Sequence, residues 1–186
     1  MAQPAPHADK RINHVEFVHR PGERKLVHAL FNLLGFEIVE MLDGEIILGL
    51  VDAPTFEELE NDNYLAGREV RPEQWAFDQA LAAALKQAPL ADAYQKHQEL
   101  LAWRPQWGMH FGVHYRALDN WEAAIASVGE VEQHYPELSG RVRLLKVFRP
   151  NDGEQRFPLY QAFVWTDVLA SGSLALGQRI ELAARV

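Results

Sequence analysis

The order of sequence patterns that begins in the first quarter of the chain recurs from the third quarter onward. In each copy a strand pattern with alternating apolar residues is followed by an amphipathic helix pattern and then by two more strand patterns. The first copy opens at "INHVEFVH" and the second at "MHFGVHY". A repeated pattern of apolar faces predicts two similar β-α-β-β units that bury those faces in the same way.

The two predicted helices share one spacing of apolar residues, i, i+3, i+4 and i+7, which is typical of a single buried helix face. These residues are Val27, Leu30, Phe31 and Leu34 in the first copy and Trp121, Ala124, Ile125 and Val128 in the second. Gly35 and Gly129 follow the two faces, where a left-handed C-cap is favoured. Asp119 with Glu122 three residues later predicts a capping box at the start of the second helix.

Each copy is expected to end in one further strand. "QRIELAARV" closes the second copy as a strand, and the matching strand of the first copy is expected in "NYLAGREV", ending near Glu69. Two helix patterns between the copies, "PEQWAFDQALAAALKQA" and "LADAYQKHQELLAW", predict a helical insert. The expected organisation is a flexible tail at 1–10 and a single domain at 11–186, with module one at 11–70, the insert at 71–104 and module two at 105–186.

Composition narrows the classes of partner and chemistry. The 186 residues are 48% hydrophobic with a net charge of −8 and no cluster of Lys or Arg, so nucleic acid is not expected as a partner. The apolar runs are too short to span a bilayer, and "MAQPAPHADK" lacks the apolar segment of a secretory signal. The absence of cysteine removes thiolate ligands and nucleophiles, and the cytoplasm is the expected location.

This order of elements resembles the vicinal oxygen chelate superfamily, which includes glyoxalase I, bleomycin-resistance proteins, fosfomycin-resistance enzymes and extradiol dioxygenases. The segments that carry the resemblance are "NHVEF", "LFNLLGFEIVE" and "RIELAAR", and it covers nearly the whole chain apart from the tail and the insert. It implies an α+β fold in which two βαβββ modules form a cup-shaped mixed sheet around a metal ion. It also implies a homodimer.

In that superfamily the metal ligands come from the first and last strands of each module. The resemblance therefore implies His14 and His110 from the first strands, and Glu181 and Glu69 from the last. Imidazoles and carboxylates without thiolate suit Fe²⁺, Mn²⁺, Ni²⁺, Co²⁺ or Zn²⁺, with Fe²⁺ favoured here. Three ligands would leave positions for substrate and O₂, whereas four would favour Lewis-acid chemistry.

Other polar and aromatic residues are candidates for the surroundings of the metal. His114 and Glu16 share the strand faces of the two histidines and are interpreted as outer-sphere groups or a general base, or as residues lining a wet pocket. Gln161, Glu181 and Arg185 resemble the end of 4-hydroxyphenylpyruvate dioxygenases, which implies substrate contacts for Gln161 and Arg185. Phe163 and Trp165 share the face of Gln161 and either contact substrate or belong to the core.

The function expected from this resemblance is that of a divalent-metal-dependent enzyme acting on a small oxygenated organic substrate, with a dioxygenase-like reaction slightly favoured. A glyoxalase-like lyase or isomerase is the first alternative. The second is a metal-free protein that sequesters an aromatic compound in the same cup, as bleomycin-resistance proteins do.

Overall fold

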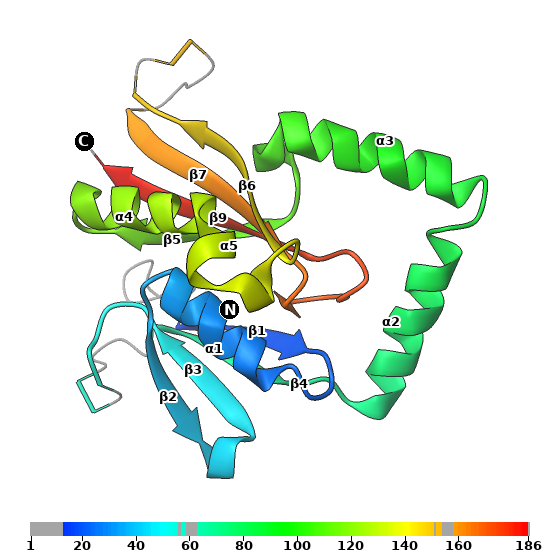
Figure 1. The fold of residues 1–186 in the computed structure, drawn as a ribbon, viewed down its shortest axis with the longest axis horizontal. Coiled ribbons are helices and arrows are strands. Elements are labelled where there is room, and N and C mark those ends of the chain that lie inside the picture. The colour runs from blue at the N-terminus through cyan, green and yellow to red at the C-terminus, as the bar shows by residue number, and fades with distance from the viewer. Residues whose placement is uncertain (1–12, 56, 59–62, 151, 154–157, 186) are drawn as a thin grey trace, which may run out of the picture.

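The structure is a computed structural model that describes residues 13–55, 57–58, 63–150, 152–153 and 158–185; the expected tail at 1–10 lies outside them. It confirms the α+β class, with two mixed sheets and the helices shown in Figure 1. The strands are β1 (His14–His19), β2 (Glu37–Met41), β3 (Ile46–Leu50), β4 (Tyr64–Glu69), β5 (His110–Tyr115), β6 (Val142–Phe148), β7 (Leu159–Thr166), β8 (Leu169–Ala170) and β9 (Gln178–Arg185). The α-helices are α1 (Arg24–Leu33), α2 (Pro72–Ala84), α3 (Leu90–Trp103), α4 (Leu118–Gly129) and α5 (Val131–His134).

The strand order repeats as the sequence pattern does. One sheet has the order β2-β3-β4-β1-β8 and the other the order β5-β9-β7-β6. In each sheet the first strand of the copy runs parallel to its last strand, β1 beside β4 and β5 beside β9, while the remaining pairs are antiparallel. Strands β1, β2, β3 and β4 therefore correspond to β5, β6, β7 and β9.

Strand β8 was not expected from the sequence, and it joins the two halves. It follows β7 in the second copy but pairs antiparallel with β1 of the first copy, where Val18 lies opposite Ala170. The edge of the first sheet is thus closed by a segment from the other half of the chain. The described strands form two hydrogen-bonded sheets, whereas one cup-shaped sheet was expected from the sequence.

The helix faces expected from the i, i+3, i+4, i+7 spacing are buried in one core that draws on both halves. Val27, Leu30 and Phe31 of α1 and Leu34, its C-cap, are at most 1% exposed. In α4, Trp121, Ala124 and Val128 are buried while Ile125 packs against the core. The Phe17 ring of β1 lies 5.0 Å from the Phe111 ring of β5. Burial of these apolar surfaces is the main favourable term that holds the two halves together.

A half-buried ion cluster adds a polar link between the halves. The Arg141 guanidinium donates to Glu23, at the start of α1, over 2.8 Å, and also to Asp167 after β7. Arg20, which follows β1, donates to the same Asp167 carboxylate over 2.7 Å. Two cations from opposite halves thus share one carboxylate, which fixes the end of β1 against the β7–β8 turn.

The helix ends differ in part from expectation. Gly35 has φ +76°, as expected of a left-handed cap, but α4 continues through Gly129, so that glycine is not its cap. The capping box is also wrong, because Ala117 in extended conformation is the N-cap of α4 and no side chain caps it. Asp119 is instead the second residue of α4, where its negative charge still stabilises the N-terminus of the helix.

The expected insert forms the helices α2 and α3, which extend away from the two sheets in Figure 1. Each has a single buried side chain, Asp78 in α2 and Leu101 in α3, while Phe77, Leu90 and Trp103 are exposed. The buried Asp78 carboxylate accepts hydrogen bonds from the Ser173 hydroxyl and the Ala175 amide in the β8–β9 loop. No helix in the described part of the chain has both the length and the apolarity needed to cross a membrane.

Candidate active site

One face of the second sheet carries most of the residues singled out in the sequence. Because side chains alternate along a strand, β9 directs Ile180 and Leu182 to one face and Glu181 to the other. The first face packs into the core, where the Trp121 indole donates to the Leu182 carbonyl over 2.8 Å. Phe163 of β7 lies opposite Glu181 in the register, on the face away from α4.

On this second face the first and last strands of module two bring a histidine and a glutamate together. His110 Nε2 lies 3.1 Å from Glu181 Oε2. The other ring nitrogen of His110, Nδ1, donates to the Gly108 carbonyl over 2.8 Å, and Gln161 donates to Glu181 Oε1 over 2.5 Å. The Phe163 ring meets the imidazole edge-on at 5.4 Å between centroids. Both members of the pair are therefore held in place by neighbours on adjacent strands and in the preceding loop.

The protonation of this pair follows from its hydrogen bonds. A carbonyl oxygen only accepts, so the Gly108 contact fixes a proton on His110 Nδ1. The hydrogen bond to Glu181 raises the pKa of His110, against the effect of burial. The same bond lowers the pKa of Glu181, with a smaller contribution from Gln161. Since the Nε2 lone pair and the carboxylate would otherwise repel, a proton or another cation must lie between them.

A cavity of about 410 Å³ opens beside His110. Its walls come from α3, the 107–111 segment and the 171–179 segment around the β8–β9 loop. The loop is held from outside by the Asp78–Ser173 hydrogen bond. Gly108 permits the close approach of α3, because a Cβ atom there would lie 3.1 Å from Leu101 Cδ2.

His14, the counterpart of His110 in module one, has different neighbours. Its imidazole stacks on the Tyr64 ring at 5.3 Å, and its Nδ1 contacts Asn13 Oδ1 at 2.7 Å. Its Nε2 lies 3.8 Å from the Glu16 carboxylate. Among the described residues no group of three or more His, Cys, Asp or Glu side chains is placed to hold a metal ion, so His14 does not join the His110–Glu181 pair.

The strand register identifies the residue of module one that corresponds to Glu181. His110 lies opposite Arg179, two residues before Glu181, and His14 lies opposite Tyr64, two residues before Ala66. The counterpart of Glu181 is therefore Ala66, not Glu69. The Glu69 carboxylate accepts a hydrogen bond from the Gly22 amide over 2.9 Å, at the far end of β1 from His14.

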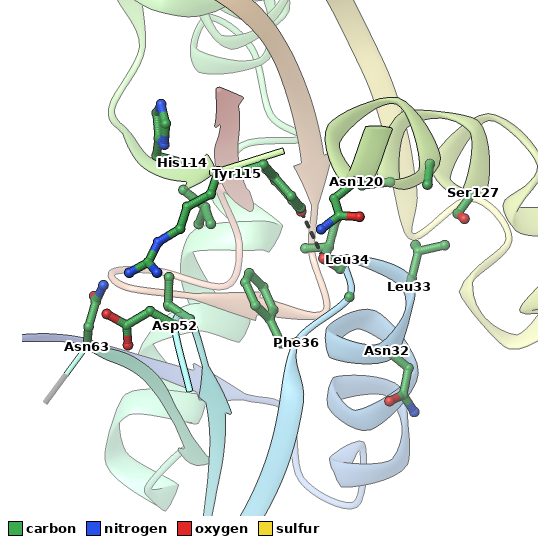
Figure 2. Close-up of a pocket in the computed structure, with 16 residues that line it drawn as sticks. Asn32, Leu33, Leu34, Phe36, Asp52, Asn63, His114, Tyr115, Asn120 and Ser127 are labelled. Atoms are coloured by element: carbon green, nitrogen blue, oxygen red, sulfur yellow. Dashed lines mark hydrogen bonds between the residues drawn. The ribbon is translucent and has the colours of Figure 1, made fainter. Parts of the chain in front are cut away.

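The remaining polar candidates lie apart from the pair. Glu16 forms an ion pair with Arg68 on the neighbouring strand at 2.8 Å. His114 lines a separate hollow of about 740 Å³ between α1, β5 and α4, together with Asp52 and Asn120 (Figure 2). At the floor of that hollow the Tyr115 hydroxyl donates to the Leu34 carbonyl, the dashed line in Figure 2. Burial raises the pKa of Tyr115, so this hydroxyl stays a donor.

The four residues expected to contact substrate are spread along the same face as the pair. Gln161 contacts Glu181 directly, and Phe163 is fully buried against His110. Trp165 stacks under the Arg143 guanidinium at 4.4 Å, and Arg185 lies exposed at the end of β9. Phe163 thus packs as a core residue beneath the pair, which was the alternative weighed for it.

Sequence reasoning missed Arg179, which lines the cavity with His110 and is 7% exposed. Burial lowers the pKa of its guanidinium. A signal was available, since Arg179 precedes Glu181 by two residues and must share its face. Gln98, which accepts a hydrogen bond from Arg179 over 2.9 Å, comes from the insert and has no counterpart in the repeat.

Comparisons with known proteins do not assign this chain to a family. No family model matches this chain, and no curated protein matches it. The resemblance to the vicinal oxygen chelate superfamily therefore rests on the order of elements and on the residues described above.

Proposed function

We propose that this chain is a divalent-metal-dependent enzyme of the vicinal oxygen chelate kind, acting on a small oxygenated organic substrate. The observation that carries the proposal is the convergence of His110 and Glu181 from the first and last strands of module two. These are the two strand positions from which that superfamily takes its ligands. The matching strand orders of the two sheets support two βαβββ modules that act as halves of a cup.

The chemistry of the donors suits a metal ion at module two. With Nδ1 committed to the Gly108 carbonyl, His110 directs the Nε2 lone pair at Glu181, which is the tautomer that a metal ligand needs. Gln161 orients the carboxylate as an outer-sphere partner would. The described residues supply two donors, and a third would have to come from His14 by closer approach of the modules.

The register favours a set of three ligands over four. Ala66 stands where a fourth carboxylate would be needed, so His14, His110 and Glu181 remain. Two histidines and one carboxylate form the set used by Fe²⁺ oxygenases, which leaves three coordination positions for substrate and O₂. This supports the dioxygenase-like reaction over the glyoxalase-like one. When the metal is absent, the pair holds a proton at Nε2 and offers it to a substrate oxygen.

Metal analysis tests this proposal directly. Untagged protein is loaded with Fe²⁺ or Mn²⁺, dialysed, and analysed for bound metal beside the variants His110→Ala and His14→Ala. We expect about one metal per wild-type chain and little in either variant, while circular dichroism stays unchanged. Oxygen uptake on a panel of catechols and 2-oxo acids then separates a dioxygenase from a lyase. A metal-free wild-type protein would overturn the proposal.

A second candidate is a metal-free protein that sequesters a small molecule. It is favoured by the apolar walls of the cavity beside His110, which include Leu101, Trp107 and Phe111. Binding of aromatic compounds with equal affinity by metal-loaded and chelator-treated protein would support it.

The proposal includes a homodimer in the cytoplasm and no affinity for nucleic acid. The exposed Phe77, Leu90 and Trp103 of the insert favour contact with a second copy through α2 and α3. The net charge of −8 disfavours binding to a phosphate backbone. Light scattering tests the dimer, and retention on a DNA column tests the second statement.

A further inference from the structure

We propose that the cavity beside His110 binds the carboxylate group of a small organic acid, with Arg179 as the residue that holds it. The inference rests on the proposed function in taking this cavity as the substrate site, and it adds the chemical class of the substrate.

Arg179 is a buried cation whose hydrogen-bonding capacity is largely unused. It is 7% exposed, and its Nη2 donates to the neutral Gln98 Oε1 over 2.9 Å. Its Nε has no hydrogen-bond partner among the described residues. A guanidinium has five N–H donors in a planar fork, so most of the fork remains free to bind a ligand.

No carboxylate of the described residues forms an ion pair with Arg179. The charged groups that act on it include Arg143 and, when protonated, His110, and both of them repel it. Glu181 shares its strand face but is taken up by His110 and Gln161. Because an uncompensated buried charge is costly, an anion entering the cavity would supply the missing counter-charge.

The walls of the cavity indicate what the rest of the ligand must be. They include Leu101, Trp107, Met109, Phe111 and Leu176 beside the polar Arg179 and His110. A volume of about 410 Å³ is in the range of small-molecule sites. One planar fork in an apolar cavity suits a bidentate monoanion with a hydrophobic body, whereas a phosphate dianion would call for further cations.

Isothermal titration of metal-free, chelator-treated protein tests the inference. The probes are benzoate, its neutral analogue benzamide, and phenyl phosphate. We expect benzoate to bind wild-type protein at least tenfold more tightly than benzamide, because a hydrogen-bonded charge pair forms only with the anion. Phenyl phosphate should bind more weakly than benzoate.

The variant Arg179→Gln should lose at least tenfold in benzoate affinity while its benzamide affinity stays the same. Arg71→Gln, which removes an exposed arginine at the start of α2, is the matched control and should bind benzoate as wild type does. If Arg179→Gln does not fold, Arg179→Lys keeps the charge without the fork, and an intermediate loss of benzoate affinity is expected.

Thermal unfolding gives a second readout. Without ligand, Arg179→Gln should melt no lower than wild type, because it removes a buried charge that lacks a counter-ion. Saturating benzoate should then raise the melting temperature of wild-type protein but not that of the variant. Equal binding of benzoate and benzamide, no binding of either, or unchanged benzoate affinity in Arg179→Gln would overturn the inference. Since all these measurements use metal-free protein, they do not depend on whether the metal proposal holds.

Discussion

His14 and His110 open equivalent strands, but the nearest carboxylate lies on a different strand in each case. His110 faces a carboxylate on the neighbouring last strand at 3.1 Å, while His14 has its closest carboxylate, Glu16, on its own strand at 3.8 Å. In the aligned registers Glu16 corresponds to Gly112, and Ala66 corresponds to Glu181. Each half thus has one histidine, one glutamate and one small residue at the same three positions, with the glutamate on a different strand.

This exchange explains why only one half builds a tight pair. Residues two apart on one strand point in parallel from the same face, so Glu16 reaches His14 only at the end of its side chain. It is instead drawn to Arg68 on β4, and about half of its side chain is exposed. Glu181 approaches His110 from the neighbouring parallel strand, beside Gly112, where a Cβ atom would lie 3.8 Å from the Glu181 side chain. The close contact between a histidine and a carboxylate therefore lies in module two.

The largest expected effect concerns the core that the two halves share. Trp121→Ala should lower the free energy of unfolding by about 3–5 kcal/mol, because it empties a fully buried site and leaves the Leu182 carbonyl without its donor. Leu30→Ala at the matching helix face should cost about 2–5 kcal/mol. Urea denaturation followed by fluorescence and by circular dichroism measures both. Two separate transitions in either variant would show that the halves fold as independent units.

The next largest effect compares the carboxylates of the two halves. Glu181→Gln should weaken metal affinity by about 100-fold or more, equivalent to about 2.7 kcal/mol, because it removes a proposed ligand. Glu16→Gln should cost less than about tenfold, since that carboxylate faces Arg68 and not the pair. Metal competition titrations measure both. An equal loss in the two variants would mean that both halves supply a carboxylate to one site.

The fold could be predicted from the sequence further than the site could. Apolar spacing and the repeated order predicted both helix faces, the closing strand of each copy and the insert, because burial of apolar surface dictates those patterns. The parallel pairing of the first and closing strands came from the structure. The β1–β8 pairing was missed, since strand partners distant in sequence leave no periodic signal. His110 and Glu181 share a face by alternation along their strands, but Glu69 was aligned by sequence alone. Only the register showed that Ala66 occupies the matching position.

An intermediate effect is expected for the ion cluster that joins the halves. Arg141→Met should destabilise the chain by about 1–2 kcal/mol, because it leaves the half-buried Glu23 and Asp167 carboxylates with Arg20 alone. Arg149→Met is the matched control: its exposed pair with Glu122 lies within module two and should contribute about 1 kcal/mol or less. Chemical denaturation at low and high salt measures the difference. Equal losses of stability in the two variants would show that the cluster does not link the modules more strongly than an exposed ion pair within one module.

A smaller effect should appear in the pH dependence of stability. The lowered pKa of Glu181 stabilises the fold above its ordinary value of 4.5, and this is lost as pH falls through the lower folded value. The raised pKa of His110 stabilises the fold below its ordinary value of 6.5, and this is lost as pH rises through the higher folded value. The stability difference between metal-free wild type and His110→Gln should therefore be largest between pH 4.5 and 6.5. A difference that is flat from pH 4 to 9 would contradict the pairing.

The smallest effect is expected for Glu69→Gln, and it decides whether module one supplies a fourth ligand. Along β4, Glu69 lies three residues beyond Ala66, so the two side chains leave the strand on opposite faces. Its carboxylate accepts one exposed hydrogen bond from the Gly22 amide, which the amide oxygen of Gln can also accept. We therefore expect a change in stability of about 0.5 kcal/mol or less and metal affinity equal to that of wild type. The same titration that measures Glu181→Gln serves here, with Glu69→Ala as a second variant that abolishes the hydrogen bond. If Glu69→Gln lost metal as Glu181→Gln is expected to, module one would have to shift its β1–β4 register by an odd number of residues to turn Glu69 onto the face of His14. The two halves would then be chemically alike, and the four-ligand, glyoxalase-like reaction would replace the oxygenase.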